Sequence, residues 1–108
     1  MVHRIFEFYK LFYSIGGKLP KRERYGIYAT ADRLCISIIE DLIAGALETK
    51  ALKRAPLVHA RLRIEMLKRL IRLMHELKAV PEKWYIATEQ ELQEISKMLN
   101  GWIRYVEH

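Results

Sequence analysis

Cationic side chains are concentrated between residues 51 and 80, where eight lysines and arginines meet only two acidic residues. This stretch has a net charge of +6, which equals the net charge of the whole chain, so the remaining residues are neutral in sum. Four of the cations recur at spacings of seven, seven and four residues, within about 40° of one another on a helix: Arg54, Arg61, Lys68 and Arg72. Arginine forks bind phosphate at two points, so this basic row favours a polyanionic partner, and nucleic acid above all.

A solvated helix face is the alternative interpretation of the basic row. Glu65 is the only acid along the row, so pairing between side chains three or four residues apart is expected to leave most of its charge uncompensated. Arg69 lies elsewhere on the same helix, and Lys21 and Arg22 follow Pro20 in a second cluster. Helix starts disfavour cations, so that cluster would need an anionic group of the partner nearby. We count these three cations as further binding candidates.

The other reactive residue types form no catalytic or metal-binding pattern. The four histidines show neither i, i+4 pairing nor the Glu-x-x-His spacing of di-metal bundles, and the chain has no P-loop and no GxGxxG. Cys35 has no base near it in the sequence, and a buried core position is expected for it. We therefore expect a protein that is not an enzyme and that needs no cofactor or metal.

Sparse glycines and prolines divide the chain into amphipathic helices, and no alternating strand pattern interrupts them. The expected helices cover about residues 2–15, 20–49, 56–78 and 82–107. Short connections between long helices favour an all-α, up-down four-helix bundle with a single domain over residues 1–108. The third helix is expected to face the core with a stripe spaced by threes and fours, which Leu67 and Ile71 broaden: Val58, Leu62, Met66, Leu70, Met74 and Leu77.

The second and fourth helices add two expectations about packing. The second helix is apolar over about 200° of its wheel, which is wider than one small bundle needs. We expect its surplus isoleucines to form a subunit interface of a ring-like homo-oligomer: Ile36, Ile39 and Ile43. In the fourth helix, Gly101 is expected to mark a close helix crossing beside a buried Trp102.

The composition also bears on location. No apolar run approaches the 18 or so residues of a membrane span, and a single cysteine fits a reducing compartment. We therefore expect a cytoplasmic protein without membrane association.

Three segments resemble one family of small bacterial four-helix-bundle proteins, in the order in which they occur there. They are LPKRERYGIYATADRLCISIIEDLIAGA, LKRLIRLMHEL and EKWYIATEQELQEISKMLNGWIRY. The last segment resembles the closing segment of the accessory variability determinant (Avd) branch, found in diversity-generating retroelements, more than that of the ribosomal intervening-sequence branch. Ser96 and Asn100 stand where that closing segment typically has glycine.

The resemblance implies a homopentameric barrel of bundles with a positively charged surface. Such proteins bind the retroelement's reverse transcriptase and its template RNA, and they support mutagenic cDNA synthesis, the step behind mutagenic retrohoming, without being polymerases. By this resemblance Arg61, Lys68 and Arg72 are the first candidates for contact with the RNA or the polymerase. The alternative is a non-enzymatic bundle of the intervening-sequence type, which acts in protein–protein interaction without nucleic acid.

Overall fold

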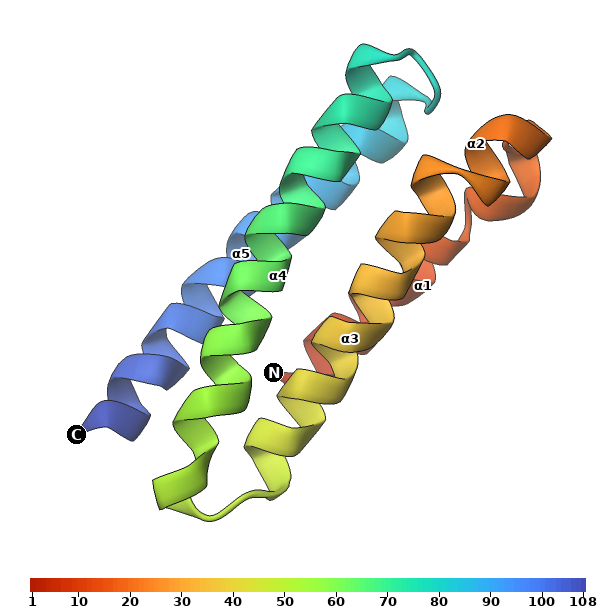
Figure 1. The fold of residues 1–108 in the computed structure, drawn as a ribbon. Coiled ribbons are helices and arrows are strands. Elements are labelled where there is room, and N and C mark those ends of the chain that lie inside the picture. Colours follow the sequence, from red (N-terminus) through yellow and green to blue (C-terminus); the bar gives the residue numbers. More distant parts are fainter.

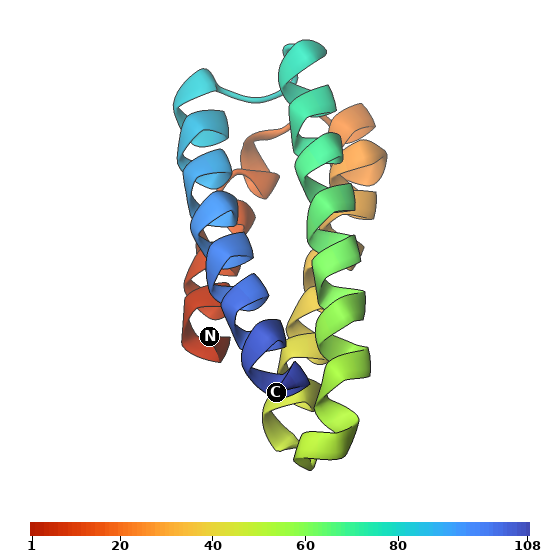
Figure 2. The ribbon, with the colours of Figure 1, turned by 90° about the vertical axis from the view of Figure 1, so that its left-hand side faces the viewer.

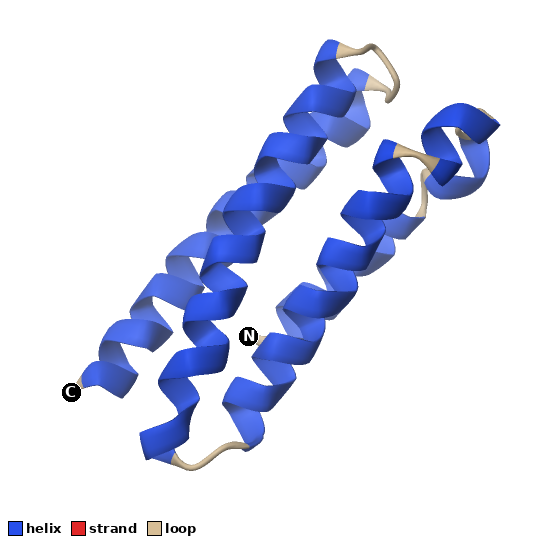
Figure 3. Ribbon diagram, viewed as in Figure 1, coloured by secondary structure: helices blue, strands red, loops and turns tan.

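The computed structural model describes all 108 residues, and Figure 3 shows helices joined by short turns, without strands. The molecule measures 45 × 21 × 20 Å. Its elements are, in chain order, α1 (Val2–Tyr13), the 3₁₀ turn η1 (Gly16–Lys18), α2 (Lys21–Tyr25), α3 (Ile27–Leu47), α4 (Lys50–Glu76) and α5 (Glu82–Glu107). The all-α class expected from the sequence is confirmed.

The four longer helices form a bundle in which each helix runs antiparallel to the next (Figures 1 and 2). Around the bundle, α3 packs between α1 and α4, and α5 packs between α4 and α1. Short turns connect the neighbours, since only two residues separate α3 from α4 and five separate α4 from α5. The up-down arrangement places α4 and α5 side by side along their whole length (Figure 2).

Aromatic side chains fill the core at the end of the bundle where α1 and α3 are joined. The rings of Phe12 and Tyr28 stack with their centroids 4.7 Å apart, and Trp84 packs on Phe12 at 5.6 Å. The Tyr28 hydroxyl donates to the Phe12 carbonyl, and the Trp84 indole N–H donates to the Leu11 carbonyl. These bonds satisfy the polar ends of buried aromatic residues, and they tie α1 to both α3 and α5.

The helix expected over residues 20–49 is divided at Gly26. The Gly26 N–H donates to the Glu23 carbonyl, and α3 starts in a new direction one residue later. A Cβ atom at Gly26 would lie 2.6 Å from the Arg22 carbonyl oxygen, so only glycine fits this turn without a shift. The result is a short α2 that folds across the end of the bundle as a separate turn of helix.

The third long helix starts earlier than the sequence indicates. It begins at Lys50, so Pro56 lies inside α4 rather than before it. The Lys53 ammonium donates to the carbonyls of Gly45 and Ala46, at 2.7 and 3.3 Å, and so satisfies acceptors at the end of α3. At its other end, α4 stops with Lys78 in the left-handed conformation, at a φ of 58°.

The core face of α4 is a different one from the stripe that the sequence indicates. The buried residues are Leu57, Ala60, Ile64, Leu67, Ile71 and Met74. Of the expected face, Leu67, Ile71 and Met74 are buried, and Val58 and Leu70 are partly buried. In contrast, Leu62 is 63% exposed and Met66 is 47% exposed. The helix is apolar around much of its circumference, and contact with α3 and α5 selects a face that overlaps the expected one only on the side of Leu67, Ile71 and Met74. Several apolar residues in and just after α4 are therefore exposed, and we call four of them the outer stripe: Leu62, Met66, Leu73 and Leu77.

The close helix crossing lies at Gly45 and not at Gly101. A Cβ atom at Gly45 would lie 2.4 Å from Cδ2 of Leu57 and 3.6 Å from the Trp102 ring, whereas a Cβ at Gly101 would meet nothing within 4 Å. Trp102 is only partly buried, although it packs against the core. It lies at the end of the bundle that α1 does not reach, because α1 has 12 residues and α5 has 26. Figure 2 shows the N-terminus partway along the bundle, so beyond it α3, α4 and α5 pack as three helices.

Candidate nucleic-acid interface

The basic row follows the edge of α4 that faces α5. Arg54 reaches Glu107 of α5 with 3.2 Å between Nε and Oε1. Near the other end of α4, Lys68 and Arg72 border a shallow hollow whose α5 side is formed by Tyr85 and Glu89. The four cations of the row therefore lie along one edge of the molecule, as the helical spacing predicts.

Acidic residues compensate more of the row than the sequence analysis expects. Lys68 pairs with Glu65 at 3.1 Å, and Arg72 pairs with Glu76 at 3.2 Å, both within α4. The pair of Arg54 with Glu107 comes from a neighbouring helix, which sequence spacing along α4 could not indicate. Exposed pairs of this kind contribute only about 0–1 kcal/mol each, so a phosphate can displace the carboxylate at little cost.

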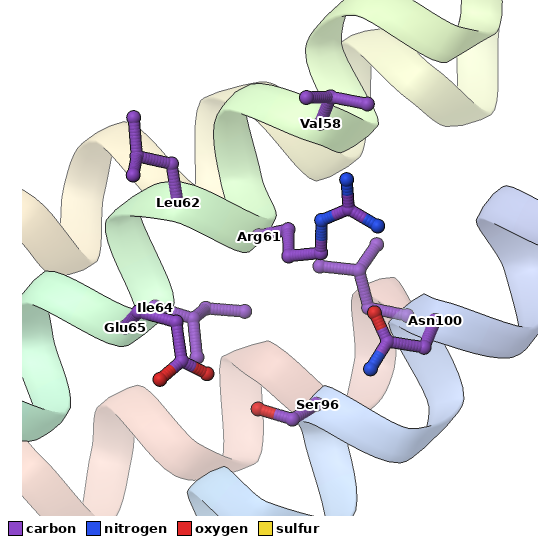
Figure 4. A pocket seen from close by; sticks show the side chains of 8 residues that line it. Val58, Arg61, Leu62, Ile64, Glu65, Ser96 and Asn100 are labelled. Carbon is purple, nitrogen blue, oxygen red and sulfur yellow. The ribbon is translucent and has the colours of Figure 1, made fainter.

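Arg61 is the member of the row without an acidic partner, and it borders a cleft of about 400 Å³ between α4 and α5. Figure 4 shows the Arg61 side chain near Asn100 at one end of this cleft, with Glu65 and Ser96 towards the other. The Ser96 hydroxyl is buried and has no hydrogen-bond partner. Aliphatic side chains complete the lining: Val58, Leu62, Ile64 and Leu99.

Of the remaining predicted cations, Arg69 borders the same hollow as Lys68 and Arg72. It is exposed there, and its only hydrogen bond goes to the Glu65 carbonyl at 3.4 Å. Lys21 and Arg22 are exposed in α2, which packs on α3, so the structure does not bring them together with the basic row. His75, which follows the row, stacks on Tyr85 with the ring centroids 4.0 Å apart and is therefore committed to the α4–α5 contact.

The groups with shifted pKa values lie outside the basic row. The pKa of Arg4 is raised by its hydrogen bond to Glu91 of α5. Burial raises the pKa of the Cys35 thiol well above its usual range, so the thiol stays protonated at neutral pH. Burial also raises the pKa of Tyr9, and its hydrogen bond to Asp32, 2.6 Å long, adds to this effect. No three His, Cys, Asp or Glu residues lie close enough together to hold a metal ion.

These features describe an all-helical bundle with a cationic edge along one pair of helices. The chain belongs to the bAvd-like family, whose model matches residues 1–106. This is a family of accessory, non-catalytic proteins, the accessory variability determinants of diversity-generating retroelements, and it is associated with a reverse transcriptase. No curated protein and no solved structure matches the chain. No helix combines the length and apolar character that a membrane crossing requires.

Sequence reasoning missed two features of this surface. Ser96 and Asn100 line the α4–α5 cleft, although the sequence analysis did not assign them to a site. The one indication in the sequence was that these two residues occupy positions where the family's closing segment typically has glycine. Three residues of the outer stripe, Leu62, Met66 and Leu77, were assigned to the core, because helical periodicity alone does not tell which of two overlapping apolar faces packs.

Proposed function

We propose that this protein supports mutagenic cDNA synthesis in a diversity-generating retroelement by binding the template RNA along the basic row of α4, together with the reverse transcriptase. The observation that carries the proposal is the position of the net charge. Helix α4 has eight basic and two acidic residues, so its +6 equals the net charge of the chain. Binding through such an edge depends on the release of counterions, with little reading of sequence.

The proposal includes a ring-like homo-oligomer, a pentamer by analogy with the family. Ile36 supports it, since it is 41% exposed on α3, and Ile39 and Ile43 beside it are only partly buried. These three isoleucines are the proposed subunit interface. In a ring, each copy adds its own basic row, so several rows can contact one RNA.

The test of RNA binding compares two variants with the same change in charge. Arg61→Glu/Lys68→Glu/Arg72→Glu reverses three cations of the row, whereas Lys18→Glu/Lys83→Glu/Lys97→Glu reverses three exposed lysines elsewhere. RNA affinity is measured from 50 to 300 mM salt by fluorescence anisotropy. Plotted as log K against log salt, the affinity has a negative slope, and each lost phosphate contact reduces its magnitude by about 0.7 for a single strand. The slope of the row variant is therefore expected to be smaller in magnitude by about 2 or more.

The control variant separates a specific edge from general charge attraction. It is expected to keep most of the wild-type slope, because its lysines lie outside the row. Equal losses in the two variants, or a wild-type affinity that does not respond to salt, would refute RNA binding through the row.

The oligomer is tested separately by multi-angle light scattering at micromolar concentration. The wild type is expected to elute as a closed oligomer, and Ile36→Ser/Ile43→Ser is expected to shift it towards smaller species. A monomeric wild type would contradict the ring. RNA binding by a single bundle would still be tested by the salt titration.

A further inference from the structure

The cleft between α4 and α5 combines polar groups at its two ends with aliphatic walls. Its volume of about 400 Å³ lies in the range of sites that hold small ligands. Arg61 and Asn100 lie at one end, and Glu65 and Ser96 lie towards the other (Figure 4). Aliphatic side chains make up the rest of the lining. Such a cleft fits a ligand that has an anionic end, a largely apolar body and hydrogen-bonding groups at its far end.

The Ser96 hydroxyl is available to a ligand. A serine or threonine inside a helix often donates to the carbonyl four residues earlier. Thr88 of the same helix does so, since its Oγ1 lies 3.0 Å from the Trp84 carbonyl oxygen. The buried Ser96 oxygen has no such bond and no other partner, and it points towards the Glu65 side of the cleft (Figure 4). A buried hydroxyl without a partner is unfavourable, so a ligand that bonds to it gains affinity.

The charges at the two ends of the cleft also leave room for a ligand. Arg61 and Glu65 are one helical turn apart on α4, yet they form no ion pair with each other. Glu65 pairs with Lys68 through Oε1 alone, so Oε2 can accept a hydrogen bond from a ligand. The cleft can therefore bind an anion at Arg61 and an N–H donor at Glu65 at the same time.

We infer that this cleft binds one nucleobase of a single-stranded RNA, with a phosphate of the same nucleotide on Arg61 and the edge of the base at Glu65 and Ser96. A base taken out of a stack is commonly held between apolar side chains and read by hydrogen bonds along its edge. A carboxylate accepts from an amino group such as cytosine N4, whereas uracil has a carbonyl oxygen at that position. The inference rests on the proposed function, to which it adds one point of base recognition.

The surroundings of the cleft favour a nucleotide within a strand. Arg54 lies seven residues before Arg61, or about 10 Å away along α4. An alkyl chain would leave the hydroxyl and the carboxylate of the cleft facing methylene groups, which is unfavourable for both. The adjoining hollow, which Glu65 also lines, offers three cations for a further phosphate: Lys68, Arg69 and Arg72. A strand can use the cations on both sides of the cleft, and a free nucleotide cannot.

The experiment measures the affinity of the full chain for two labelled oligoribonucleotides by fluorescence anisotropy, at neutral pH and one salt concentration. One probe contains only cytosine and the other only uracil. Because the probes have the same length and charge, the ratio of their affinities reports base recognition alone. The wild type is expected to bind the cytosine probe at least about fivefold more tightly. Glu65→Gln weakens the acceptor and Ser96→Leu fills the cleft, so each is expected to bring the two affinities within about twofold of each other.

Two matched control variants change α5 outside the cleft. Glu94→Gln removes a carboxylate that pairs with Lys97, three residues later, as Glu65 pairs with Lys68. Gln93→Leu adds a leucine to an exposed position of the helix that contains Ser96. Both controls are expected to keep the wild-type ratio of affinities. Circular dichroism verifies that each variant is folded.

The outcomes distinguish this inference from the function on which it rests. If the wild type binds neither probe, the proposed function itself fails. If it binds both probes equally well, or if Glu65→Gln and Ser96→Leu keep the wild-type preference, only the base site is overturned. Free cytidine monophosphate is expected to displace the probe only weakly, because it does not reach the cations beside the cleft. Displacement at micromolar concentration would assign the cleft to a free nucleotide and overturn binding of a strand.

Discussion

Gly45 of α3 lies against Leu57 of α4 and Trp102 of α5, and Gly45→Ala tests whether this crossing is as tight as the structure indicates. In a helix interior, alanine is favoured over glycine by about 1 kcal/mol. The added Cβ would lie 2.4 Å from Cδ2 of the fully buried Leu57, so the neighbours must move. Overpacking of this kind costs about 1–3 kcal/mol. The net effect is a loss of about 0–2 kcal/mol in the free energy of unfolding.

Gly101→Ala is the matched control, because it makes the same substitution in a long helix without a steric conflict. A Cβ at Gly101 meets nothing within 4 Å, so only the gain in helix propensity of about 1 kcal/mol remains. The two variants should therefore differ by about 1–3 kcal/mol. Since 1 kcal/mol corresponds to roughly 4–8 °C in a domain near this size, their melting temperatures should differ by at least about 4 °C.

Urea unfolding followed by circular dichroism measures both variants at one protein concentration, because self-association would shift the apparent stability. A Gly45→Ala protein as stable as Gly101→Ala would refute the close crossing. A double variant identifies the atoms responsible. In a Leu57→Ala background the conflicting Cδ2 is absent, so Gly45→Ala should become stabilising there, and an unchanged penalty would implicate Trp102 instead.

Three further predictions concern the core face of α4 and the buried polar groups. Leu67→Ala should destabilise the protein by about 2–5 kcal/mol, whereas Leu62→Ala should change its stability by no more than about 0.5 kcal/mol, and equal urea midpoints would contradict the face assignment. Cys35 should react with a thiol reagent far more slowly in the native protein than in urea, and a fast native reaction would contradict its burial. Burial raises the pKa values of Tyr9 and Tyr28, so above pH 10, near the unfolded value, the unfolded chain loses protons that the folded chain keeps. The free energy of unfolding should therefore be constant up to about pH 10 and fall as the pH rises further. It should fall less steeply for Tyr9→Phe/Tyr28→Phe than for the wild type, and parallel pH profiles of the two proteins would contradict this.

The sequence predicts the helical class and the positions of several turns because glycine and proline act locally. Gly16, Gly17 and Pro81 lie in connections between helices, as the sequence indicates. Pro56 does not, since the packing of α4 on α3 overrides its preference for a helix start. The break at Gly26 is evident only in the folded backbone, where a Cβ at this position would lie 2.6 Å from the Arg22 carbonyl oxygen.

Prediction of the candidate site was limited in the same way. The helical spacing correctly places the basic row on one edge of α4, because that is a property of the helix alone. Which edge faces α5, and that Glu107 pairs with Arg54, depend on the packing of helices far apart in the sequence. The outer stripe shows this limit most clearly. Met66 and Ile64 are equally suitable for a core, and only the positions of α3 and α5 decide that Ile64 is buried.

The short α1 divides the bundle into two ends that differ in local stability. Where α1 is present, four helices and the stacked aromatic rings hold the backbone. Beyond its N-terminus, α3, α4 and α5 hold one another, and Trp102 is left partly open to solvent. Segments with fewer buried contacts open at a lower free-energy cost than the rest of a domain. Amide protons near the turn between α3 and α4 should therefore exchange with solvent through small openings that leave the aromatic end intact. The proposed RNA-binding edge would thus extend from a mobile end of the protein at Arg54 to a rigid one at Arg72.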